Sequence, residues 1–190
     1  MHSHGAPCSY LSGEDGSTGR SLVTQNGAGF AGLVREHQAM VFSIAFRFLR
    51  DRSVAEELAQ DVFLRLYREL PRLESPEHIK FWLRKVITHR AMDYARAAHR
   101  RREVAMDELP EPAVRPREGD PLLQASLRKL VASLPNEARM VIVLRYEEEM
   151  EPQEIAEVLG LPLATVKSRL HRSLVLLRGK AQRLMGESIR

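Results

Sequence analysis

The side chains best suited to contact with a polyanion lie near the C-terminal end of the chain, between Glu154 and Arg172. Hydroxyl, ammonium, guanidinium and imidazole groups can donate hydrogen bonds to phosphate oxygens and to base edges in the major groove of DNA. The sequence therefore predicts that this segment binds duplex DNA. The candidate donors are Thr165, Lys167, Ser168, Arg169, His171 and Arg172.

Two short helices joined by a tight turn are expected to position these donors. Apolar residues recur at helical spacing in Ile155 and Leu159 and again in Val166 and Leu170. Gly160 lies between the two pairs and suits the position after a helix end, where a positive φ is needed. The pattern is typical of a helix-turn-helix whose second helix contacts DNA.

A second set of candidate contacts lies between His78 and Arg102, where Asp93 is the only acidic residue. Dense cations on one helix can make several phosphate contacts, which hold DNA without reading its sequence and weaken steeply with salt. The alternative interpretation is a basic face that is merely solvated. The cations are Lys80, Arg84, Lys85, Arg90, Arg96 and the run Arg100, Arg101 and Arg102.

A third candidate surface is formed by Glu57, Gln60 and Asp61, on a helix predicted over residues 54–70. Spacings of three and four residues place these side chains on one face of a helix. They lie beside an expected buried stripe, so they form a separate polar patch. Their alternative role is only to keep an exposed helix soluble. The expected stripe is Val54, Leu58, Val62, Leu66 and Leu70.

No segment alternates between polar and apolar residues as a strand does, so the chain is expected to be all-α. Ser53 with Glu56 predicts a capping box at the start of one helix, and Ser75 followed by Pro76 predicts the start of another. The expected helices span 30–50, 54–70, 75–102, 122–133, 135–148, 152–159 and 163–184.

Two breaks divide the chain into two small helical domains. Residues 1–28 are rich in Gly, Ser, His and Asn without periodicity and are predicted to be a disordered tail. Acidic residues interrupted by Pro110, Pro112 and Pro116 predict a flexible linker over 103–121. The expected domains are therefore 29–102 and 122–184, with the helix-turn-helix in the second.

Composition narrows the function classes. The net charge of +4 and the sequence pI near 9.5 are compatible with a polyanionic partner. The single Cys8 excludes an internal disulfide, and no apolar run approaches the roughly 20 residues that span a bilayer. We therefore expect a cytoplasmic protein without an export signal or membrane insertion.

The sequence contains no glycine-rich phosphate loop and no nucleophile with a base at suitable spacing, so we predict no enzyme and no cofactor. His2, His4 and Cys8 are the only residues suggestive of a metal site. A tail offers them no preorganised geometry and no evident fourth ligand, so no metal is predicted.

The three candidate surfaces, which run along the chain from the α-helical polar patch at residues 57–61 through the basic stretch at 78–102 to the helix-turn-helix at 154–172, resemble the extracytoplasmic-function sigma factors, the small two-domain members of the sigma-70 family of bacterial RNA polymerase initiation subunits. The resemblance covers about 30–102 and 122–180. Residues 55–65 are similar to the segment that docks on the clamp helices of the largest core subunit. This similarity gives Glu57, Gln60 and Asp61 a polymerase-binding role.

The resemblance also assigns the two basic regions to promoter DNA. Residues 81–94 with the arginine run resemble the part that melts and reads the minus-10 element, which adds His89 and Asp93 to the candidates. His89 stands where many members carry asparagine, so the base preferred there is open. The resulting minus-10 set is Lys80, Arg84, His89, Arg90, Asp93, Arg96, Arg100 and Arg101.

The second domain resembles the minus-35 reader, so the donors of the helix-turn-helix are assigned to that element. The resemblance further implies core RNA polymerase and promoter DNA as partners, an anti-sigma factor as a regulator, and a monomer when free. A homodimeric helix-turn-helix repressor or activator is the alternative, and a helical adaptor that binds no DNA is a third possibility. A dimer that binds DNA unaided would favour the repressor.

Overall fold

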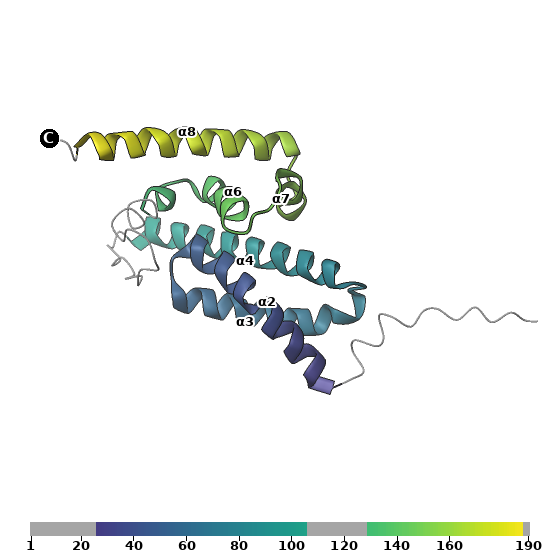
Figure 1. The fold of residues 1–190 in the computed structure, drawn as a ribbon. Coiled ribbons are helices and arrows are strands. Elements are labelled where there is room, and N and C mark those ends of the chain that lie inside the picture. The colour runs from purple at the N-terminus through teal and green to yellow at the C-terminus, as the bar shows by residue number, and fades with distance from the viewer. Residues whose placement is uncertain (1–25, 106–128, 188–190) are drawn as a thin grey trace, which may run out of the picture.

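The computed structural model describes residues 26–105 and 129–187, and within these ranges the chain is helical with no strand (Figure 1). This confirms the all-α prediction. This part of the chain contains six α-helices and one short 3-10 helix. They are α2 (Asn26–Leu49), α3 (Arg52–Glu69), η1 (Leu70–Arg72), α4 (Pro76–Ala105), α6 (Asn136–Tyr146), α7 (Pro152–Leu159) and α8 (Leu163–Glu187).

Helices α2, α3 and α4 pack on one another and form the first bundle. The expected stripe of α3 is buried at Leu58, Val62, Leu66 and Leu70, while Val54 is half-buried. Burying each large apolar side chain contributes roughly 1.5–3 kcal/mol. The amphipathic period of α3 thus determines which of its faces remains for contacts with other molecules.

The helix starts agree with the sequence in one case and differ in another. Ser75 caps α4, because its hydroxyl accepts a hydrogen bond from the His78 amide at 3.1 Å. The prediction of Ser53 as the N-cap of α3 was wrong. The helix begins earlier, and the Asp51 carboxylate accepts a hydrogen bond from the Val54 amide at 3.1 Å. Asp51 has the extended backbone of an N-cap residue, whereas Ser53 is already inside the helix.

Two further boundaries differ from those predicted from the sequence. Helix α2 begins at Asn26, inside the segment expected to be a tail, and α4 continues to Ala105, so residues 103–105 of the expected linker are helical.

Gly160 ends α7 in the left-handed conformation, with φ 64° and ψ 37°, as its position in the sequence predicted. A Cβ added there meets no atom within 4 Å, so Gly160→Ala should cost only backbone strain, about 1–2 kcal/mol. Gly179→Ala is the matched control, because a Cβ there also meets nothing and Gly179 is helical. That variant should gain about 0.5–1 kcal/mol. Urea unfolding checks both, and equal values would contradict this account.

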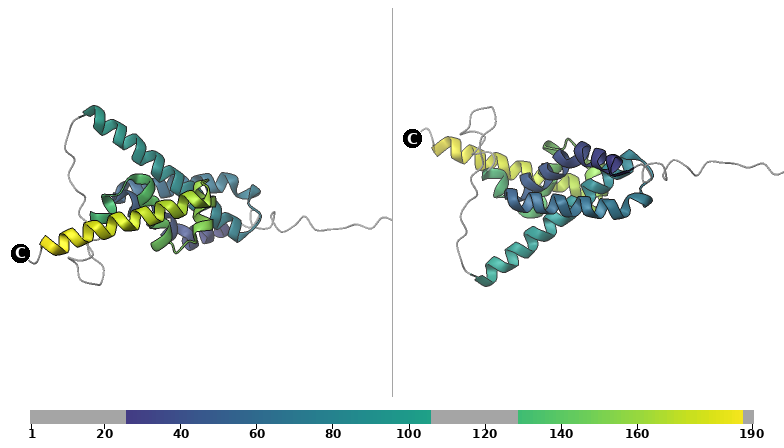
Figure 2. Two further views of the ribbon diagram at one scale, coloured as in Figure 1. Left: turned by 90° about the horizontal axis from the view of Figure 1, so that it is seen from above. Right: turned by 90° about the horizontal axis from the view of Figure 1, so that it is seen from below.

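The two helical regions pack directly against each other, which the sequence did not predict. Helices α6 and α7 lie between α8 and the first bundle, and they contact α4, while α6 also contacts α2 (Figures 1 and 2). A single cluster of buried apolar residues runs through both regions. It includes Phe48 and Leu83 from the first bundle and Met140, Met150 and Ile155 from the second.

Among the described residues, no helix is long and apolar enough to cross a membrane.

Candidate nucleic-acid interface

The polar patch on α3 does not present its three predicted residues equally. Glu57 and Gln60 are exposed, and neither side chain forms an ion pair or a hydrogen bond within the described structure. Asp61 is half-exposed and accepts a hydrogen bond from Arg90 Nη2 at 2.6 Å, with Arg65 Nε at 3.4 Å. Asp61 therefore ties α3 to α4, and Glu57 and Gln60 remain for a partner.

An apolar extension of this patch was missed by the sequence reasoning. Leu64 and Tyr67 are 62% and 66% exposed and follow Gln60 at helical spacing. Leu64 and Gln60 border a groove of about 670 Å³ between α2 and α3, which is also lined by Phe30 and Phe42. The signal in the sequence that could have revealed this extension is that Leu64 and Tyr67 are apolar but lie off the buried stripe of α3. The face of α3 is thus polar at one end and apolar at the other.

Helix α4 divides the predicted minus-10 residues among different faces. Spacings of four, three and four residues place His89, Asp93, Arg96 and Arg100 on one side of the helix. His89 Nδ1 donates to the Lys85 carbonyl oxygen at 2.7 Å, since a carbonyl can only accept, and this leaves Nε2 available. Within the same face, the Asp93 carboxylate accepts from Arg96 at 2.6 Å.

The remaining cations of α4 lie elsewhere. Arg90 points to Asp61, and the Arg101 guanidinium lies 5.8 Å from the centre of the Tyr94 ring. Lys80 is exposed near the start of the helix. Arg84 is half-buried, and its Nε is buried with no hydrogen-bond partner among the described residues. The structure therefore does not gather the predicted set on one surface.

Arg84 lies near an acidic residue of the second region, Glu148. Burial raises the pKa of Glu148 above its ordinary value of 4.5, and the charge of Glu147 acts in the same direction. A hydrogen bond with Ser43 and the charges of Arg84 and Arg47 each lower this pKa by less than burial raises it. These three residues all belong to α2 or α4, so Glu148 faces the first bundle.

The raised pKa predicts a pH dependence of stability. The folded chain binds the Glu148 proton more tightly than the unfolded chain, so this group favours folding below pH 4.5. That contribution is lost as the pH rises through the raised pKa. Glu148→Gln cannot titrate. As the pH rises through the raised pKa of Glu148, the free energy of unfolding of the variant should therefore increase relative to that of the parent. Urea unfolding at several pH values measures it, and a constant difference would contradict the prediction.

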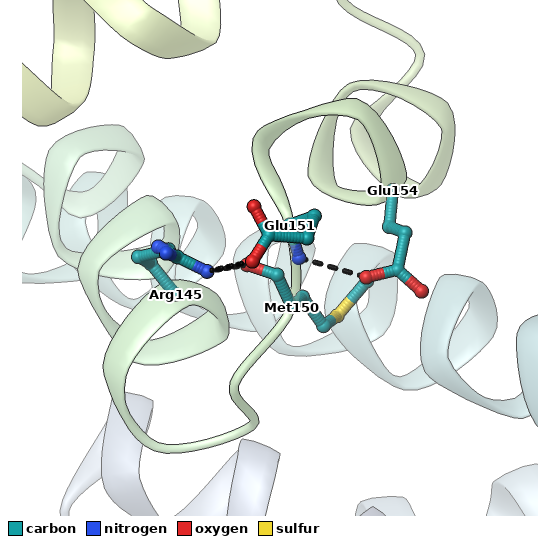
Figure 3. Close-up of polar contacts among 4 residues, drawn as sticks. All are labelled: Arg145, Met150, Glu151 and Glu154. Atoms are coloured by element: carbon teal, nitrogen blue, oxygen red, sulfur yellow. Dashed lines mark hydrogen bonds and ion pairs between the residues drawn. The ribbon is translucent and has the colours of Figure 1, made fainter.

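The helix-turn-helix is held at the start of α7 by a local network (Figure 3). Arg145 Nη1 donates to the Met150 carbonyl oxygen at 3.0 Å and to Glu151 Oε1 at 2.9 Å. The Glu154 carboxylate accepts from the Glu151 amide at 2.7 Å, completing a capping box. Met150 is fully buried. Arg145 thus joins the end of α6 to the start of α7 and sets the entry into the helix pair.

The predicted minus-35 donors lie on the first turns of α8, whose Val166 is fully buried. Lys167, His171 and Arg172 are exposed, and Thr165 and Ser168 are half-buried. Arg169 differs from the others, because its Nη2 lies 2.7 Å from Glu137 Oε2 on α6. Five of the donors are therefore free of internal ion pairs in the described structure, and Arg169 must leave Glu137 or share it when it contacts a ligand.

Within the described residues, no group of three or more His, Cys, Asp and Glu side chains is arranged to hold a metal ion. The candidates His2, His4 and Cys8 lie outside the described residues.

Comparison with known proteins yields two family matches. Residues 33–101 match the family model described as Sigma-70 region 2, and residues 124–177 match the model described as Sigma-70, region 4. The first match contains α3 and most of α4. The second contains the helix-turn-helix.

Relatives and solved structures agree with these matches. The chain is 34% identical to SigE of Mycolicibacterium smegmatis, 30% to SigW of Bacillus subtilis and 32% to the sigma-E factor of Streptomyces coelicolor, over 74%, 75% and 78% of this chain. These matches span 56%, 83% and 84% of the relatives' own lengths. The Mycolicibacterium match thus leaves nearly half of that relative outside the comparison.

Two solved structures share the fold. The sigma factor RpoE of Bartonella quintana, solved with the anti-sigma factor NepR, has a TM-score of 0.69 at 19% identity, covering 80% of this chain and 96% of that one. CnrH, solved with the cytosolic domain of CnrY, has a TM-score of 0.62 at 22% identity, covering 87% and 96%.

Proposed function

Since the chain belongs to the sigma-70 family, in its extracytoplasmic-function group, we propose that it binds core RNA polymerase and directs initiation at specific promoters. The observation that carries this proposal is the exposure of two separate contact surfaces, one within each family region. These are the α3 face at Glu57 and Gln60 and the donors at the start of α8. The chain supplies no catalysis or cofactor of its own and acts in the cytoplasm, where the polymerase and the DNA are.

Docking on the polymerase is assigned to the exposed face of α3. Glu57 and Gln60 supply charge and hydrogen bonding to a basic surface, and Leu64 supplies apolar contact beside them. Asp61, the third predicted residue, is a positioning residue, because its carboxylate holds Arg90. Polymerase binding thus depends on the α3–α4 angle as well as on the exposed side chains.

Promoter opening is assigned to the face of α4 that carries His89, Arg96 and Arg100. Separating a base pair costs about 1–2 kcal/mol per step, so a small domain must capture unpaired bases and their phosphates. The imidazole of His89 can accept a hydrogen bond at Nε2 or stack on a base, and the arginines neutralise phosphates. Arg84, Arg90 and Arg101 contribute less directly, because they face other parts of the chain.

Reading of the duplex upstream element is assigned to α8. Lys167 and Arg172 are exposed and suit phosphates or guanine, while Thr165 lies near the helix start, where phosphate contacts are common. A bidentate arginine contact with guanine contributes about 1–3 kcal/mol of discrimination. Arg169 can make that contact after leaving Glu137.

A regulator that covers these surfaces is also proposed. Two proteins of the same fold were solved with an anti-sigma factor or a partner's cytosolic domain. The exposed apolar groove beside α3 offers this chain a site for a protein helix. We accordingly expect a monomer when free and an anti-sigma partner in the cell.

Reconstitution with purified bacterial core RNA polymerase tests the proposal. The intact chain should bind the core enzyme and produce discrete transcripts from a library of genomic fragments, with none from core enzyme alone. A folded chain that binds no core enzyme, and that sediments as a dimer able to bind a palindromic duplex unaided, would replace the proposal with the repressor alternative.

A further inference from the structure

A cavity of about 420 Å³ lies where the C-terminal end of α2 meets α6 and α8, and we call it the α2-end cavity. Its walls are largely apolar, and two of the side chains that line it, Tyr146 and Leu174, are 55% and 42% exposed. A cavity of this size, with an apolar lining and a few polar groups, is typical of a site for a small molecule. The apolar lining includes Val131, Ile142, Val143, Tyr146, Leu174 and Leu177.

The polar groups of the α2-end cavity carry a net positive charge. Arg47, Arg50 and Glu147 line it, and Arg47 forms an ion pair with Glu147. Arg139 lies close to the cavity, since its Nη2 donates to the carbonyl oxygen of the lining residue Ala132. Burial lowers the pKa of Arg139, and the charge of Arg50 lowers it further. The two guanidinium groups therefore repel each other, and an anion beside Arg50 would relieve that repulsion.

The backbone at Arg50 has a conformation that is unusual for a residue with a side chain. Arg50 directly follows α2 and has a φ of 63°, in the left-handed region. Its amide donates to the Phe46 carbonyl oxygen at 2.8 Å, which closes the last turn of the helix. Glycine adopts this conformation most easily, and other residues held in it cluster at functional sites. The side chain that this turn carries is an arginine that lines the cavity.

The groove between α2 and α3 differs from the α2-end cavity in its charge. Its two charged residues, Arg52 and Glu56, form an ion pair with each other at 2.8 Å. That groove is therefore balanced in charge, whereas the α2-end cavity combines apolar walls with an excess of positive charge. Because a guanidinium group binds carboxylates in a bidentate geometry, this combination favours a ligand with an apolar body and an anionic head.

We propose that the α2-end cavity binds a small anionic amphiphile, in which a carboxylate contacts Arg50 and an apolar chain lies against Val143 and Leu174. The cavity shares no residue with the surfaces assigned above to the polymerase and to DNA. The site is thus additional to the proposed function, and its test requires neither polymerase nor promoter.

Three probes with the same alkyl chain and different head groups test the charge preference. They are decanoate, decanol and decyltrimethylammonium. Isothermal titration calorimetry of the full chain at neutral pH, below the micelle concentration of each probe, measures their affinities. One decanoate should bind per chain, about tenfold more tightly than either of the other probes, because only its head group is an anion.

Loss of the Arg50 charge tests the contact with the head group. Arg50→Asn removes the guanidinium but keeps a residue that tolerates the left-handed conformation. It should weaken decanoate binding about tenfold and leave decanol binding unchanged. Arg68→Asn is the matched control, because Arg68 is exposed on α3 and its loss changes the net charge equally, away from the cavity. This control should bind decanoate as the parent does.

A polar substitution in the wall tests the contact with the apolar chain. Leu174→Gln should weaken the binding of decanoate and of decanol alike, each about fivefold, because the chain loses apolar contact. Val175→Gln is its control, since Val175 is 57% exposed on the same helix and does not line the cavity. The two variant pairs together separate the charge of the site from its apolar wall.

Methyl resonances of the parent chain locate the bound probe. Decanoate should shift the signals of Val143 and Leu177, which line the α2-end cavity, and leave those of Val34 and Ala39, which line the groove between α2 and α3. Shifts confined to Val34 and Ala39 would overturn the proposal by assigning the binding to the groove.

Two calorimetric results would also overturn it. One is equal affinity of the parent chain for the three probes, which would show apolar binding without charge selection. The other is an Arg50→Asn variant that binds decanoate as tightly as Arg68→Asn does.

Discussion

Glu57→Arg is expected to weaken binding to core RNA polymerase by about 100-fold, equivalent to about 2.7 kcal/mol. Glu57 lies on the exposed face of α3 and has no ion pair within the described structure, so its reversal should leave the fold intact. A carboxylate at a docking face implies a basic partner surface, and placing like charges together costs several kcal/mol. Leu64 is exposed on the same face of α3, where it would add apolar contact to the proposed docking surface.

Glu74→Arg provides the control for this measurement. Glu74 is exposed in the same bundle and gives the same change in net charge away from the α3 face. Titration of labelled protein with core enzyme should show parental affinity for the control. Equal affinity of both variants would remove the α3 face from the docking surface. Asp61→Arg is less informative, because it also breaks the hydrogen bond from Arg90 and would confuse docking with the packing of α3 on α4.

Arg139→Met is expected to lower the free energy of unfolding by about 3 kcal/mol. Methionine keeps an unbranched chain over the Phe48 ring but donates no hydrogen bond. The carbonyl oxygens of Phe48, Ala132 and Leu134 would each lose a charged donor in partly buried surroundings. Burial and the charge of Arg50 already lower the pKa of Arg139, which indicates how far the guanidinium is removed from water.

Arg178→Met provides the comparison, since Arg178 is exposed on α8 and its loss should change stability by no more than about 0.5 kcal/mol. Urea unfolding followed by circular dichroism measures both variants. The parent should unfold in one transition, because its buried cluster joins the two regions. Arg139→Met should split that transition into two or shift its midpoint to a lower urea concentration. A variant with parental stability would show that the network contributes little.

The helices themselves follow from short-range rules. The stripe of Leu58, Val62 and Leu66, the Ser75 cap and the left-handed Gly160 are all decided by residues within four positions of one another. The Ser53 error has the same origin, since Asp51 two residues earlier is an equally good cap and the sequence gives no means of choosing between them.

The sequence by itself determined the all-α class, the helix-turn-helix and the face of α3 that carries Glu57 and Gln60. Only the tertiary structure decided which of these groups are free. Asp61 meets Arg90 across 29 residues, and Arg139 meets Phe48 across 91. Helical periodicity assigns a side chain to a face, but its partner depends on how whole helices pack, which is set by the shape of the common core rather than by neighbours in the chain.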